Sequence, residues 1–183
     1  MVSSMSDYST DGIVSARQVK EQNNTHDTIK KDIQVVEFVL GNEHFAIDLF
    51  DVREVVEYTT ITKLPNSPSY IKGIIDLRGE ITTIIDLKQR LNVIDQHLVE
   101  EQNSRIIVLD ENITQSKIGI MVDDVSSVST INMGQVDSTA TTIRQQDSSI
   151  IGIIKKKVRV KDKDINELVI WIDIKPLIQD IHL

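Results

Sequence analysis

The 183-residue chain contains no cysteine, only 4% aromatic residues and no excess of positive charge. Without cysteine it has no thiol nucleophile, no thiolate metal site and no disulfide scaffold, and it suits a reducing compartment. Its 20 basic and 28 acidic residues give a net charge of −8, which disfavours nucleic acid as a partner unless a local basic patch exists. No apolar run approaches the roughly 20 residues that span a bilayer, and residues 1–11 do not resemble a secretory signal. We therefore expect a cytoplasmic protein.

Sequence signatures of catalysis are also missing. The four histidines are dispersed, and the seven glycines form neither a phosphate-binding loop nor a nucleotide fingerprint. Asp123 and Asp124 are the most catalytic-looking pair, and a hydrolase that uses them is one hypothesis. Neighbours in sequence rarely face the same way, so we interpret Asp124 as a helix cap instead. The sequence predicts no catalytic residue, no metal, no cofactor and hence no enzyme.

The residues that are abundant point to β-structure. The chain has 29 isoleucines and 19 valines, and side chains branched at Cβ suit pleated strands. Residues 1–33 are instead polar, with few and scattered apolar residues, and we expect a disordered tail there. Residues 34–183 are expected to form the folded domain.

Two hairpins are predicted in the first half of this domain. Alternating apolar residues on both sides of a turn at residues 41–43 indicate the first, and residues 74–85 around Arg78 and Gly79 indicate the second. Between them, Val52, Val55 and Val56 have helical spacing, so we predict a short helix that Asp51 caps. A further helical turn is expected over residues 69–72, ending at Gly73, and another short helix after Asp86.

The second half repeats this plan. Strands are expected at residues 105–109 and 117–122. Residues 124–128 mirror 51–55, residues 152–154 mirror 73–75, and residues 172–175 mirror 85–88. We predict an all-β fold with short helices, made of two partly open antiparallel barrels, because closure hides strand edges that would otherwise aggregate. Their ranges would be roughly 34–104 and 105–183, either self-contained or exchanging a terminal strand.

A basic run from Lys155 to Lys161 leaves a second function open. The run could contact nucleic acid or anionic lipid. Acidic residues follow at once, however, and no aromatic residue is interleaved for base stacking. A solvated hairpin whose charges discourage edge pairing is the favoured interpretation, and a small nucleic-acid-binding barrel is the alternative function.

Several ordered motifs within residues 34–181 carry a family resemblance. The segment YIKGIIDLRG at residues 70–79, followed by IIDL at 84–87, resembles the CheW family of chemotaxis coupling proteins. FAIDL at residues 45–49, VREV at 52–55 and GIMVDDV at 119–125 fit the same family in the same order.

The resemblance implies a non-catalytic adaptor built from two five-stranded SH3-like barrels. Such a protein couples methyl-accepting chemoreceptors to the histidine kinase CheA. It would bind the regulatory domain of the kinase and the cytoplasmic tip of the receptor, and it would meet the membrane only through receptor clusters. No nucleic acid is implied as a partner. A groove between the lobes could accept a receptor helix.

The family also suggests which residues bind these partners. Arg78 is the first candidate, because a planar guanidinium can donate to receptor carbonyls or carboxylates; a solvated turn residue is the alternative. Glu54 and Val52 lie where the family meets its partners, or else they cap and pack the predicted helix. The remaining candidates, for whose aliphatic members a core role is the stronger interpretation, are Leu49, Val55, Gly73, Gly79, Arg105, Gly119, Val125 and Val128.

Overall fold

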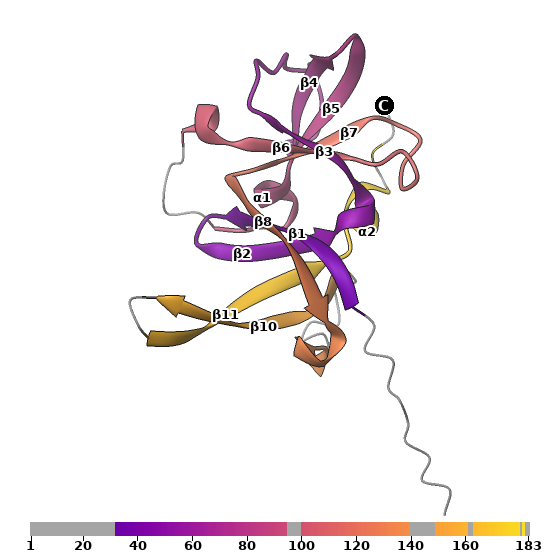
Figure 1. Cartoon of the computed structure of the whole chain (residues 1–183). Helices are drawn as coiled ribbons and strands as arrows, with labels where there is room; N and C mark the ends of the chain where they lie inside the picture. The colour runs from indigo at the N-terminus through magenta and orange to yellow at the C-terminus, as the bar shows by residue number, and fades with distance from the viewer. Residues whose placement is uncertain (1–31, 95–99, 140–148, 161–162, 180, 182–183) are drawn as a thin grey trace, which may run out of the picture.

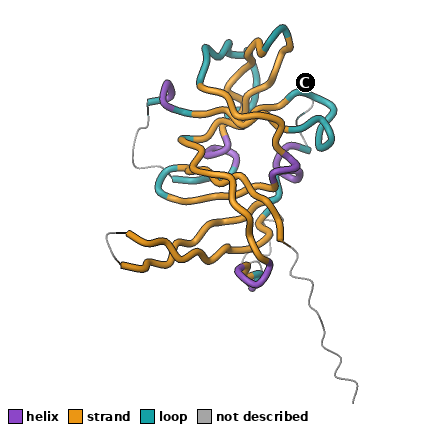
Figure 2. The backbone as a smooth tube through the Cα atoms, viewed as in Figure 1, coloured by secondary structure: helices purple, strands orange, loops and turns teal. Residues whose placement is uncertain are grey.

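The computed structural model of the chain describes residues 32–94, 100–139, 149–160, 163–179 and 181, which form two β-sheets (Figures 1 and 2). The first strand begins at Asp32, two residues before the predicted start of the domain. The tail expected at residues 1–33 lies outside the described residues except for the last two.

One sheet has six strands and the other has five. The order in the first is β8 (Asp124–Asn132), β1 (Asp32–Leu40), β2 (Glu43–Asp48), β11 (Lys163–Ile172), β10 (Ile150–Val160) and the two-residue β9 (Val136–Asp137). The order in the second is β3 (Val52–Glu57), β6 (Arg105–Leu109), β7 (Ile118–Val122), β5 (Glu80–Asp86) and β4 (Ile71–Leu77). The helices are short: α1 (Leu87–Arg90), α2 (Lys175–Ile178) and the 3-10 turns η1 (Leu49–Asp51), η2 (Glu101–Asn103) and η3 (Met133–Gln135). The predicted all-β class with short helices is confirmed, and the two sheets fit the two SH3-like subdomains that were predicted.

The strand order shows the predicted duplication. If β1 to β5 and α1 form one repeat, then β6, β7, β8, β10, β11 and α2 form the other. In the first sheet, the hairpin β1–β2 of one repeat lies between β8 and the hairpin β11–β10 of the other repeat. In the second sheet, the hairpin β6–β7 lies between β3 and the hairpin β5–β4 in the same way. The junctions β2–β11 and β5–β7 are parallel, whereas the other strand pairs are antiparallel. Each sheet therefore contains strands from both repeats, so the two sheets do not correspond to the predicted ranges 34–104 and 105–183.

Two predicted helices are wrong. Residues 52–57 form the edge strand β3, and residues 124–132 form the edge strand β8. Both strands carry a register shift, between Val52 and Glu54 in the first and opposite Glu37 and Phe38 in the second. A bulge inserts a residue into the two-residue alternation of a strand, which left the valines at helix-like spacing. The true cap in this region is Asp48, whose side chain accepts a hydrogen bond from the Phe50 amide of η1 at 2.9 Å.

Gly73 does not end a helical turn, as the sequence suggested, but lies inside β4 next to a register shift. Its φ of +146° is open to glycine and strained for other residues. A Cβ at this position would lie 2.2 Å from the carbonyl oxygen of Thr62, whose backbone bridges to Ile74. The segment before β4 therefore packs directly against its backbone.

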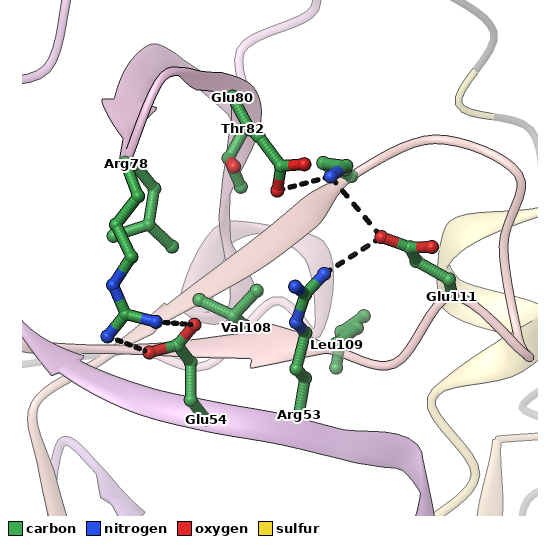
Figure 3. A pocket seen from close by; sticks show the side chains of 10 residues that line it. Arg53, Glu54, Arg78, Glu80, Thr82, Val108, Leu109 and Glu111 are labelled. Carbon is green, nitrogen blue, oxygen red and sulfur yellow. Dashed lines mark hydrogen bonds and ion pairs between the residues drawn. The ribbon is translucent and has the colours of Figure 1, made fainter.

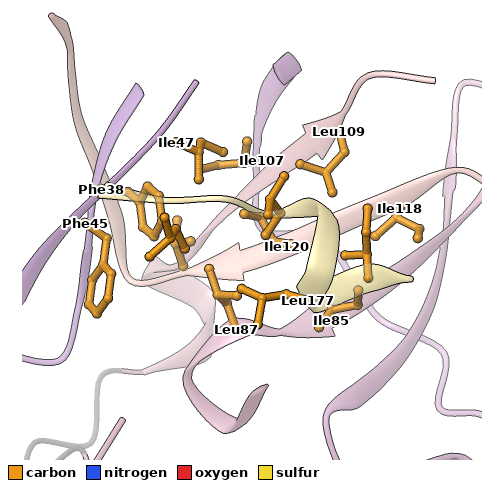
Figure 4. Close-up of a cluster of buried hydrophobic side chains, with 14 of the residues drawn as sticks. Phe38, Phe45, Ile47, Ile85, Leu87, Ile107, Leu109, Ile118, Ile120 and Leu177 are labelled. Atoms are coloured by element: carbon orange, nitrogen blue, oxygen red, sulfur yellow. The ribbon is translucent and has the colours of Figure 1, made fainter. Parts of the chain in front are cut away.

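The main hydrophobic core lies between the two sheets and draws on both repeats (Figure 4). Phe38 and Phe45 stack with ring centroids 5.9 Å apart. Buried isoleucines and leucines from β5, β6, β7, α1 and α2 complete the cluster. Two smaller clusters fill the outer faces of the sheets, one around Trp171 and the other around Ile84.

Two ion pairs that involve buried aspartates join the repeats in equivalent places. Lys88 of α1 lies 2.6 Å from Asp123, which precedes β8, and Lys175 of α2 lies 3.1 Å from Asp51, which precedes β3. Asp51 is therefore matched by Asp123, not by Asp124 as the sequence comparison assumed. Each pair fixes a helix of one repeat to the start of an edge strand of the other.

The helix predicted after Asp86 is confirmed, and a short helix also follows its counterpart Asp173. Asp86 caps α1 by accepting a hydrogen bond from the Gln89 amide at 3.2 Å. Asp173 accepts one from the Lys175 amide at 3.0 Å, and Pro176 lies in the first turn of α2. Among the described residues, no helix has the length and apolar character to cross a bilayer.

Candidate functional site

The turn between β4 and β5 presents Arg78 and Gly79. Both residues have positive φ, 56° and 84°, as a two-residue hairpin turn that matches the twist of its strands requires. The side chain of Asp76 accepts a hydrogen bond from the Gly79 amide at 2.6 Å. Nothing lies within 4 Å of a Cβ built on Gly79. The turn is therefore rigid and open to a partner.

Arg78 forms a two-point ion pair with Glu54 of β3. Nη2 lies 2.9 Å from one carboxylate oxygen and Nη1 lies 3.3 Å from the other. The Arg78 side chain is 75% exposed, while that of Glu54 is 23% exposed. Because β3 is a strand, Glu54 cannot act as the predicted helix cap. Instead it holds the guanidinium plane on the surface in one orientation.

A second charge network lies beside this pair (Figure 3). Arg53 lies 2.8 Å from Glu111, Lys117 lies 3.3 Å from Glu111, and Lys117 also pairs with Glu80. The hydrogen bond from Lys117 lowers the pKa of Glu80 below its ordinary value. The same contact raises the pKa of Lys117. The two charge networks form one surface, which we call the ionic face, across β3, the β4–β5 turn and the β6–β7 loop.

The ionic face does not resemble an enclosed ligand site. The hollow that it lines has a volume of about 30 Å³, whereas small-molecule sites usually measure about 300–1,000 Å³. No cluster of three or more potential metal ligands exists among the residues that the structure describes. What the surface offers is a set of oriented donors and acceptors on rigid strands, which suits recognition of another macromolecule.

Other candidates on the same strands lie close to this face. Leu49 and Val52 are half-buried and pack against the main core, while Val55 is 41% exposed on the edge strand β3. Val55 is therefore the aliphatic candidate on β3 that is most available to a partner.

Gly73, Gly119 and Arg105 occupy structural positions in the sheet that carries the ionic face. A Cβ on Gly119 would lie 2.8 Å from a methyl group of Ile106 and 2.9 Å from one of Ile84, so close packing explains this glycine. Arg105 donates to the carbonyl oxygen of Asn103 at 3.1 Å. It also pairs in register with Glu57 of β3.

Val125 and Val128 lie on β8, in the other sheet. Val125 packs against the main core, and Val128 is 57% exposed. They occupy the places in β8 that Val52 and Val55 occupy in β3. The structure therefore divides the candidates between two equivalent edge strands.

Sequence reasoning missed several charged and apolar residues of this region. Arg53, Glu111 and Lys117 come from three chain segments, and no local pattern predicts that their side chains meet. Phe50 is 81% exposed in η1, and an exposed phenylalanine in an otherwise regular apolar segment carries no sequence signal of its own.

The remaining sequence hypotheses concern Asp123 with Asp124 and the basic run. Asp123 is buried and bonded to Lys88, whereas Asp124 accepts from the neighbouring Val125 amide, so the two carboxylates do not form a shared site. In the basic run, Lys155 lies 2.6 Å from Asp137 and Lys156 lies 2.7 Å from Glu37. Lys161 lies outside the described residues.

Comparison with known proteins gives a consistent result. Residues 34–182 match the family model described as a CheW-like domain. The chain is 40% identical over 99 residues to the chemotaxis protein CheW of Klebsiella aerogenes, a match that spans 54% of this chain and 57% of that protein. It is 29% identical over 133 residues to CheW of Bacillus subtilis, spanning 72% of this chain and 83% of that one.

A solved structure is also similar. The crystal structure of the scaffolding protein TtCheW from Thermoanaerobacter tengcongensis superimposes with a TM-score of 0.65 at 33% identity. The match covers 81% of this chain and 94% of that chain.

Proposed function

The chain belongs to the CheW family of chemotaxis proteins, and on that premise we propose that it couples methyl-accepting chemoreceptors to the histidine kinase CheA. Members of this family are non-catalytic scaffold proteins of chemotaxis, so the chain is an adaptor and not an enzyme. The finer assignment, which partners it joins and where in the cell, is our proposal. It places the protein in the cytoplasm, at clusters of membrane receptors.

The observation that carries this proposal is the Arg78–Glu54 pair. Glu54 occupies both nitrogens of one side of the guanidinium, and the 75% exposure of the Arg78 side chain leaves its remaining donors open to solvent. A rigid cation of this kind can donate to the carbonyl or carboxylate groups at the tip of a receptor helix. We assign the receptor contact to the part of the ionic face around the Arg78–Glu54 pair, with Gly79 and Val55 at its border.

The nucleic-acid alternative has less support. Two lysines of the basic run are neutralised by carboxylates of the same chain, and the sequence of the run contains no aromatic residue. Stacking on aromatic side chains and a continuous positive groove are the usual features of proteins that bind single strands.

The test is Arg78→Ala, with Arg53→Ala as the matched control on the same face. Exposed ion pairs contribute about 0–1 kcal/mol to stability, so both variants should fold like the native chain. We expect Arg78→Ala to weaken binding to a receptor cytoplasmic fragment and to reduce receptor-dependent stimulation of CheA. Arg53→Ala removes an equal charge outside the turn and should change both quantities much less.

A Glu54→Ala variant separates orientation from charge. Arg78 keeps its charge in this variant but loses its fixed plane, so an intermediate loss of receptor binding is expected. Native levels of receptor binding and kinase stimulation by Arg78→Ala would contradict the assignment of the ionic face.

A further inference from the structure

Arg78 holds a backbone conformation that is unusual for its residue type. Three non-glycine residues of the described chain have a positive φ, and the other two, Asn66 and Asn92, are asparagines. Asparagine is enriched in the left-handed region because its short polar side chain bonds to nearby backbone. The long arginine side chain gains no such help. Residues in strained conformations persist where the surrounding structure compensates for the strain, and they gather at functional sites. The conformation of Arg78 therefore needs a support from another residue.

Asp76 provides this support from the last turn-facing part of β4. Leu77 pairs with Glu80 in the strand register, so the turn consists of Arg78 and Gly79 alone. The exposed side chain of Asp76 reaches over this turn and accepts a hydrogen bond from the Gly79 amide at 2.6 Å. That amide belongs to the peptide group that follows the Arg78 Cα, so the bond fixes the backbone next to Arg78 directly. An ionised acceptor makes such a bond shorter and stronger than a neutral one.

The backbone of Arg78 in turn decides where its guanidinium lies. β3 and β4 are opposite edges of the five-stranded sheet, and Figure 3 shows the Arg78 side chain extending from the turn to Glu54 of β3. The two contacts measure 2.9 and 3.3 Å. A change of φ at Arg78 redirects its Cα–Cβ bond, and a two-point pair tolerates little change in direction. The acceptor on Asp76 and the plane of the guanidinium are therefore linked.

We propose that Asp76 is a positioning residue for the receptor contact of Arg78. This inference rests on the proposed function and adds to it a residue that acts on the receptor only through Arg78. Without the Asp76–Gly79 bond, a smaller fraction of molecules holds the turn in the conformation that presents the guanidinium. The apparent affinity for the receptor then falls in proportion to that fraction.

The test compares two substitutions of Asp76 in the full-length chain. Asp76→Ala removes the acceptor, whereas Asp76→Asn keeps an oxygen that can accept the Gly79 amide and removes only the charge. Asp110→Ala is the matched control, because Asp110 also accepts a backbone amide, that of Asn112 at 2.8 Å, in a loop that does not hold Arg78. The affinity for a receptor cytoplasmic fragment is measured for each variant, alone and combined with Arg78→Ala. Circular dichroism checks the fold.

We expect Asp76→Ala to weaken receptor binding about two- to tenfold, the effect of losing one hydrogen bond that holds the competent conformation. Asp76→Asn and Asp110→Ala should bind within about twofold of the native chain, because the bond across the turn remains. In the Arg78→Ala background, Asp76→Ala should cause no further loss. A residue that only stabilised the hairpin would weaken binding in both backgrounds, so this comparison separates the two roles.

Hydrogen exchange of the Gly79 amide, followed by NMR, reports the turn without any receptor. An amide in a stable hydrogen bond exchanges slowly, and an exposed amide without one exchanges fast. The Gly79 amide should be protected in the native chain and in Asp76→Asn, and it should lose this protection in Asp76→Ala.

Four results would overturn the inference: native receptor binding by Asp76→Ala; an equal loss in Asp76→Asn, which would make the charge responsible; an equal further loss when Asp76→Ala is added to Arg78→Ala; or an equal loss in Asp110→Ala. In each of these cases the native chain still binds the receptor fragment, so the proposed function stands. If the native chain does not bind the fragment, the proposed function fails and this inference with it, whatever the exchange of the Gly79 amide shows.

Discussion

The substitution Gly73→Ala tests how tightly the segment before β4 is packed. The φ of +146° is a conformation that side chains with a Cβ rarely adopt, and the added methyl group would lie 2.2 Å from the Thr62 carbonyl oxygen. That oxygen accepts a hydrogen bond from the Ile74 amide at 2.9 Å, and the Thr62 amide donates to the Ile74 carbonyl at 2.8 Å. Relieving the clash therefore displaces both bonds of this bridge.

The expected cost follows from these two contributions. Backbone strain of this type costs about 1–3 kcal/mol, and each of the two lost hydrogen bonds costs about 0.5–1.5 kcal/mol, so Gly73→Ala should lower the free energy of unfolding by about 2–6 kcal/mol. This is a large part of the roughly 5–15 kcal/mol that holds a typical domain together. Urea unfolding followed by circular dichroism measures the difference.

Two other glycines provide the controls. Gly79 has a φ of +84° with nothing within 4 Å of a Cβ, so Gly79→Ala should cost only the backbone strain, about 1–2 kcal/mol. Gly152 is the counterpart of Gly73 in the second repeat, but its nearest neighbour is a Val136 methyl group at 2.7 Å, which can move. If Gly73→Ala costs no more than either control, the Thr62 segment yields freely and the argument is refuted.

Two further predictions concern the ion pairs and the exchanged strands. Burial raises the pKa of Asp51 above its ordinary 3.8, against the lowering effect of Lys175. The stability that this pKa shift of Asp51 contributes is therefore full below the ordinary pKa and is lost as the pH rises through the folded-state pKa. The free energy of unfolding of the native chain relative to Asp51→Asn should therefore fall as the pH rises above the ordinary pKa of 3.8, and a constant difference would contradict this sign. Fragments 32–104 and 105–183 should each be unfolded alone and should regain β-structure when mixed, as circular dichroism would show; a folded isolated fragment would contradict the exchange.

Local features of the fold could be predicted because their determinants are adjacent in sequence. The two first-half hairpins, the Arg78–Gly79 turn and the helix that Asp86 caps all depend on residues within a few positions of one another. The helix predicted at residues 51–56 was wrong because a β-bulge breaks the two-residue alternation of β3 and imitates helical spacing. The three valines of that strand were the better signal, since β-branched residues favour strands.

The candidate site could be predicted only in part for a similar reason. The family motif located Arg78, Gly79 and Glu54, but the ion pair between Arg78 and Glu54 joins residues 24 positions apart. The pairs of Arg53 and Lys117 with Glu111 depend on which strands lie next to each other. Alternation along a strand tells which side chains face the core and does not tell which strand is its neighbour.

The exchange of hairpins between the repeats follows from the parallel junctions. An antiparallel neighbour can be joined by a tight turn, but a parallel neighbour must come from elsewhere in the chain. β2 pairs in parallel with β11 and β5 with β7, so each parallel junction joins strands of different repeats. The helix after β5 or β11 then fixes the arrangement, because Lys88 and Lys175 each reach a buried aspartate at the start of the other repeat's edge strand. The edge strands β3 and β8 thus hold their position only when both repeats are folded. This ties the orientation of Glu54, and with it the guanidinium plane of Arg78, to the integrity of the six-stranded sheet.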